Sequence, residues 1–264
     1  MLNGFTSTTW KRDRWIAVIS LAMITVLAWV YLIDAAGGMT NMDAGGMLGM
    51  SISIMQAWRL NDFLLTFLMW TVMMAGMMMP SAAPMILTFL GIKRQRQPDQ
   101  SSLPSAFVFV LGYLAAWTLF SVAATLIQWG LHAANLLSPA MVGINPSLNG
   151  TLLILAGIYQ FTPLKNICLS SCRTPLGFLI AEWRDDVRGI FRMGARHGVY
   201  CVGCCWLLMT LLFAVGVMNL LWSAILTGII LLEKVAPGGQ WISRVIGLLA
   251  MGWGAWLLVQ IVGV

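Results

Sequence analysis

Four long runs without a charged side chain dominate this sequence and constrain its fold more than any other feature. They extend over residues 15–33, 63–92, 100–164 and 198–232. Each run is long enough for at least one membrane-spanning segment of about 20 residues. A chain inside a bilayer must satisfy its backbone hydrogen bonds internally, so we expect these runs to be helices. Only 9% of the 264 residues are charged, against about a quarter in soluble domains, which excludes an ordinary soluble protein.

The order of runs and breaks predicts an all-α, polytopic transmembrane helix bundle of about seven spans, forming a single domain over residues 1–264. Pro80 and Pro84 are expected to kink or break the second helix, because proline removes a backbone donor. The first run exceeds the roughly 7 to 15 residues of a signal-peptide core, so we interpret it as a retained anchor. The expected helices cover residues 15–33, 61–92, 103–129, 148–161 and 241–261, with two more sharing 196–234 and a tight turn near 216–219.

The distribution of lysine and arginine predicts the orientation of this bundle. Cytoplasmic loops of membrane proteins carry an excess of these residues. With the N-terminus inside, seven spans place fourteen of the fifteen basic residues on the cytoplasmic side, and only Arg59 outside. We therefore expect a multi-pass protein of the bacterial inner (plasma) membrane, with a cytoplasmic N-terminus and the C-terminus outside. The net charge of +6 then reflects orientation, and no nucleic-acid partner is expected.

The segment from Lys165 to Arg196 is predicted not to span the membrane. Its apolar residues recur at helical spacing, and charged residues occupy the opposite face. This pattern is typical of an amphipathic helix lying on the membrane surface, which we place on the cytoplasmic side. The apolar positions are Leu176, Leu179, Ile180, Trp183, Val187, Ile190 and Phe191.

All five cysteines and one of the two histidines fall within residues 168–205, and this clustering is the main indication of function. Thiolates and imidazoles are the ligands that zinc, copper(I) and iron-sulfur centres prefer. The last three cysteines are spaced three and four residues apart, so they share one helical face. If Cys168 and Cys172 bind the same ion, the segment that carries them must fold back over the helix that carries the other three. The candidate ligands are Cys168, Cys172, His197, Cys201, Cys204 and Cys205.

Methionine supplies a second set of soft ligands. Thioethers favour copper(I) over zinc. We expect an outer loop from Asp34 to Leu60 to receive metal through four methionines that stand among glycines. The methionines of the second helix, such as Met69 and Met73, are interpreted as packing, because methionine fills gaps in apolar cores. The loop candidates are Met39, Met42, Met47 and Met50.

Other polar residues give weaker indications. Glu233 and Lys234 are most simply a charge pair at the membrane edge. Cys201 and Cys204 are spaced like a redox dithiol, and Arg196 near the helix start would favour a reactive thiolate. No phosphate loop, dinucleotide fingerprint, zinc-protease motif or nucleophile elbow is present in the sequence, so no catalytic residue and no enzymatic reaction are assigned.

Three sequence blocks together resemble a known family. They are the methionine-rich block at 73–80, the block at 168–175 that holds two cysteines, and the block at 197–206 that holds His197 and three cysteines. They are similar to an uncharacterised bacterial family, a domain of unknown function, described as predicted metal-binding integral membrane proteins. The resemblance implies an inner-membrane protein with a metal site on the six Cys and His candidates, and it implies no reaction.

Three functions remain open from the sequence. The first is binding, relaying or delivering a soft metal, copper(I) or zinc, with the lipid bilayer and a metal-receiving protein as partners. The second is a membrane thiol-disulfide oxidoreductase. The third is a structural assembly factor whose thiols only pack.

Overall fold

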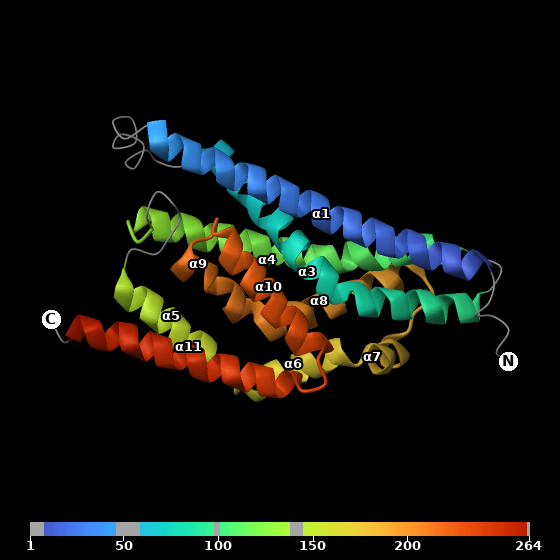
Figure 1. Ribbon diagram of the computed structural model, residues 1–264. Helices are drawn as coiled ribbons and strands as arrows, with labels where there is room; N and C mark the ends of the chain where they lie inside the picture. Colours follow the sequence, from blue (N-terminus) through green and yellow to red (C-terminus); the bar gives the residue numbers. More distant parts are fainter. Residues whose placement is uncertain (1–7, 46–58, 98–100, 138–144, 263–264) are drawn as a thin grey trace.

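The protein is an all-α bundle in the part of the chain that the computed structural model describes, residues 8–45, 59–97, 101–137 and 145–262 (Figure 1). The expected helical fold class is therefore confirmed. The helices are α1 (Thr8–Gly45), α3 (Leu60–Arg96), α4 (Leu103–Ala133), α5 (Pro146–Tyr159), α6 (Pro163–Arg173), α7 (Pro175–Glu182), α8 (Val187–Thr210), α9 (Leu212–Val215), α10 (Leu220–Val235) and α11 (Gly239–Val262).

Five segments of the described chain are long and apolar enough to cross a membrane. They are α1, α3, α4, α11 and the segment formed by α8 with α9. A bend of 64° separates α5 from α6, and these two together would give a sixth span. By length and composition the described part of the chain thus has five candidate spans, or six with this bent pair, where the sequence pattern suggested about seven. The difference includes α10, which has only 16 residues. The start of α1 and the end of α11 lie at opposite ends of the bundle (Figure 1).

The predicted amphipathic surface helix needs correction. The structure divides its residues between α7 and the first turns of α8, with a break at residues 183–186. Asp186 causes this break, because its carboxylate accepts the Gly189 amide at 2.9 Å and caps α8. Ile190, expected to face the membrane from a surface helix, is buried inside the bundle, and so is Met193. A charged contact joins the two helices across this break, where Arg196 of α8 pairs with Glu182 at the end of α7 at 2.8 Å.

Two long helices are longer than predicted. The helix α1 continues to Gly45, so the expected outer loop does not begin at Asp34. The helix α3 runs through both Pro80 and Pro84 without a break. Its methionines are buried on all sides, which supports the packing interpretation. These buried residues are Met69, Met73, Met74, Met77, Met78, Met79 and Met85.

Close backbone contact between α4 and α8 positions the face of α8 that carries the cysteines. A Cβ atom added at Gly194 would collide with the carbonyl oxygen of Phe109, and one added at Gly112 would collide with that of Phe191. Glycine is therefore required at both positions by the approach of the two backbones. This contact sets Tyr113 of α4 against the middle of α8.

Replacing Gly194 with alanine is expected to destabilise the protein by about 1–3 kcal/mol, because a methyl group forced into a packed interface displaces the backbone. Thermal unfolding of the purified protein in detergent would measure this loss. Gly228→Ala in α10 is the matched control, since nothing lies within 4 Å of its added Cβ. Equal unfolding temperatures for the two variants would contradict this account of the α4–α8 contact.

Candidate metal centre

Thiols from two separate helices converge inside the bundle. The thiol of Cys172 in α6 interacts with those of Cys201 and Cys204 in α8. Cys168 lies against Gly203, where an added Cβ would stand 2.7 Å from its sulfur. It also interacts electrostatically with Cys204. The segment carrying the first two cysteines thus folds back over α8, as the metal hypothesis required.

The geometry of α6 follows from its two ends. Thr162 caps its start by accepting the Lys165 amide at 3.3 Å, just after the bend that follows α5. At its other end Arg173 donates to the carbonyl oxygens of Ala236 at 2.7 Å and Pro237 at 3.0 Å. These bonds fasten α6 to the end of α10, so the two cysteines of α6 are held at both sides.

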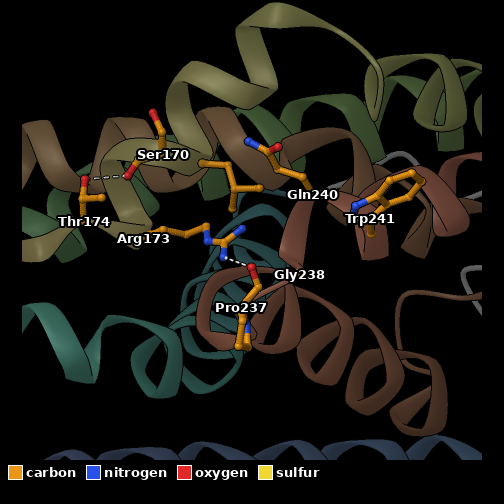
Figure 2. Close-up of a pocket in the computed structure, with 8 residues that line it drawn as sticks. Ser170, Arg173, Thr174, Pro237, Gly238, Gln240 and Trp241 are labelled. Carbon is orange, nitrogen blue, oxygen red and sulfur yellow. Dashed lines mark hydrogen bonds between the residues drawn. The ribbon is translucent and has the colours of Figure 1, made fainter.

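Figure 2 shows Arg173 reaching toward Pro237 across a groove of about 540 Å³. Gln240 and Trp241, from the start of α11, line the far side of this groove. The groove-facing residues of α6 are Leu169, Ser170 and Arg173. Neither Cys168 nor Cys172 is among the described residues that line the groove. The groove is therefore separate from the thiol cluster.

The thiol cluster lies deeper than the sequence suggested. The helix expected to begin near residue 196 would have placed these cysteines close to its start, but Cys201 stands about 21 Å along α8, at 1.5 Å per residue. Hydrogen bonds through Tyr113 and Lys234 link it to Met78 and Ser81. Both lie near the middle of α3, and Met78 is about 27 Å from each end of that helix. The reason is that α8 begins at Val187 and not near Arg196.

Lys234 of α10 binds the cluster directly, and sequence reasoning missed it. Its ammonium group stands 2.9 Å from the sulfur of Cys201 and 2.9 Å from the hydroxyl of Ser81. The hydroxyl of Tyr113 stands 3.1 Å from the same sulfur and donates to the carbonyl oxygen of Met78 at 3.2 Å. Ser81 donates to that carbonyl at 2.9 Å. The five groups form a closed hydrogen-bonded ring.

The prediction that Glu233 and Lys234 form a charge pair at the membrane edge is wrong. Successive residues of a helix point in different directions, and the two side chains have different partners. Glu233 accepts two bonds from Lys165, at 2.8 and 2.9 Å, and the exposed fractions of these side chains are 1% and 0%. Lys165 also donates to Gln160. The sequence could have indicated a role for both residues, because an ionisable residue within a membrane segment is by default a candidate functional residue.

His197 is buried within an aromatic cage beside the thiols. Its ring lies 5.6 Å from Tyr113, 5.6 Å from Phe178 and 6.2 Å from Phe109, measured between centroids. It interacts electrostatically with Cys201. Among the described residues its Nδ1 atom has no hydrogen-bond partner. Buried polar atoms are rarely left unsatisfied, so this nitrogen is available to a ligand.

The donor set fits a soft metal, although no ligand sphere is assembled. Within the described ranges, no three His, Cys, Asp or Glu side chains stand where they could hold one ion together. The thiols of Cys204 and Cys205 donate to the Cys201 carbonyl at 3.1 and 3.0 Å. The side chain of either cysteine must rotate away from this carbonyl before its sulfur can bind a metal ion. The arrangement provides paired sulfurs with a neighbouring imidazole, and it does not preform a tetrahedral four-cysteine zinc site in the described part of the chain.

Fold and site together define a helical, membrane-type protein whose interior gathers soft metal donors. The model of the PpoB2 family, described as a copper chaperone, matches residues 67–257. The chain belongs to this family. The match contains all five cysteines, His197 and Lys234, and it leaves out the methionines between residues 39 and 50. No curated protein and no solved structure shows significant similarity to the chain.

Proposed function

We propose that the protein binds copper(I) at the thiol cluster between α6 and α8 and passes it to an acceptor protein. The observation that carries the proposal is the meeting of Cys172 with Cys201 and Cys204 inside the bundle. Thiolate sulfur is a soft ligand that suits copper(I), and it also binds zinc. The family description of a copper chaperone agrees with this chemistry.

Cys201 and Cys172 are the proposed primary ligands, one from each helix, and Cys204 lies beside them. Cys201 interacts with thiols on both helices, and Cys172 is the least buried of the five cysteines. A partly exposed thiol is the natural point of exchange with an acceptor, because metal transfer between thiolates requires contact. His197 supplies its unpaired nitrogen, while Cys168 and Cys205 lie beside the primary set.

The route by which metal arrives is also a proposal. We place the N-terminus in the cytoplasm of a bacterium and the C-terminus outside, from the distribution of basic residues. Three of those residues, Lys93, Lys165 and Lys234, are buried and therefore say less about orientation than exposed ones. The outer methionines would receive copper(I). The side chains of Met39, Met42, Met47 and Met50 lie outside the part of the chain that the structure describes.

Copper binding is expected to depend on the thiols. Protein purified without oxygen in detergent and loaded with copper(I) should retain the metal through desalting, and X-ray absorption should show sulfur neighbours. A variant with all five cysteines changed to serine should retain none. A Met73→Leu, Met77→Leu variant serves as the matched control, since these buried side chains are assigned to packing.

Two outcomes would contradict the proposal. Equal copper content in the wild type and the cysteine-free variant would remove the thiols from the site. A reversible disulfide in the metal-free protein, without stoichiometric copper binding, would favour the thiol-disulfide oxidoreductase.

A further inference from the structure

Lys234 brings a positive charge into the centre of the proposed copper site. Its side chain is 7% exposed, and its ammonium group touches the Cys201 sulfur. Its charge also acts on Cys172 and Cys204. The adjacent carboxylate of Glu233 is engaged by Lys165. A buried ammonium is costly unless an anion compensates it, and Cys201 is the acidic side chain that the Lys234 ammonium contacts.

We propose that Lys234 makes this site selective for a monovalent metal ion, an inference that rests on the proposed function. Two thiolates, one ammonium group and one copper(I) ion sum to zero charge. The same two thiolates and ammonium with a divalent ion leave an excess positive charge. Inside a bundle of low dielectric constant, such an unbalanced charge weakens binding strongly.

Selectivity of this kind does not follow from sulfur alone. Thiolates also bind zinc tightly, so a bare pair of cysteines would accept both ions. A divalent ion beside Lys234 would need a third thiolate to restore neutrality. Among the described residues, no three Cys, His, Asp or Glu side chains are placed so that they could hold one ion together. Lys234 therefore acts as a specificity-determining residue through charge.

The test compares Lys234→Gln with the wild type. Glutamine can still donate to Ser81 and Cys201 but carries no charge. Copper(I) affinity would be measured by competition with a bathocuproine chelator, and zinc affinity by competition with a chromophoric dye. We expect copper(I) to bind at least about tenfold more weakly and zinc about tenfold more tightly, as charge interactions of this range allow. Lys234→Arg should keep the wild-type preference.

Lys93→Met is the matched control, because Lys93 is also buried but pairs with Asp185 at 3.3 Å, away from the thiols. Its two affinities should equal those of the wild type. Lys234→Met is a second uncharged variant, used if glutamine disturbs the fold. Circular dichroism and gel filtration would check that it is folded. If both uncharged variants keep the wild-type preference for copper over zinc, the inference about Lys234 is overturned and the proposed function is not. Failure of the wild type to bind copper(I) overturns the proposed function.

Discussion

Replacing Cys201 with serine is expected to lower the copper(I) affinity more than any other single cysteine change. Cys201 is the sulfur that interacts with Cys172, Cys204 and Cys205 and also contacts Lys234. Loss of an outer-shell partner costs about 10 to 100-fold in metal affinity, so loss of this central ligand should cost more than about a hundredfold. Serine still offers an oxygen to Lys234, so the hydrogen bond to its ammonium group is kept. Chelator competition under anaerobic conditions would measure the change.

Cys205→Ser is the matched control for this experiment. Cys205 is equally buried and lies one helical turn from Cys201. Its thiol bonds to the Cys201 carbonyl, and its thiol interactions are with cysteines of its own helix. It should therefore retain most of the affinity. If Cys205→Ser lost as much copper as Cys201→Ser, the primary ligand set would have to be redrawn around α8 alone.

The sequence predicted those parts of the site that depend on spacing within one helix. Residues three and four apart must share a face, so Cys201, Cys204 and Cys205 were grouped correctly. The convergence of α6 with α8 was a requirement of the hypothesis, since no local rule fixes how a chain folds back after a bend. The structure supplies this contact through the close approach of Cys168 to Gly203.

Two features of the site could not be predicted from local pattern. Glu233 and Lys234 look like a membrane-edge pair because adjacent opposite charges at a helix end usually are. Their separate partners, Lys165 and Ser81, are distant in sequence. The start of α8 was misplaced for a related reason. A charged helix end and a surface helix have the same alternation of apolar and polar residues, and only the Asp186 cap distinguishes them.

Glu233→Gln is expected to be the most destabilising of the polar substitutions, at a cost of about 3–5 kcal/mol, because it leaves the ammonium of Lys165 buried without a counter-charge. Lys165 is fully buried, and among the described residues its other hydrogen-bond partner is the amide of Gln160, which is uncharged. Thermal unfolding in detergent would measure the loss. A variant that unfolded like the wild type would show that this pair does not hold α6 to α10.

The double variant Lys165→Met, Glu233→Leu should recover most of that stability, because exchanging a whole buried ion pair for apolar side chains is often neutral or better. It also separates two roles of the pair. Lys165 and Cys172 lie two turns apart on the inner face of α6, so the pair can fix the position of the exchange thiol as well as the fold. If the pair only stabilises, the double variant should bind copper(I) like the wild type. If it positions Cys172, the variant should be stable but bind copper(I) more weakly, and oxidative crosslinking of Cys172 to Cys201 or Cys204 should become slower.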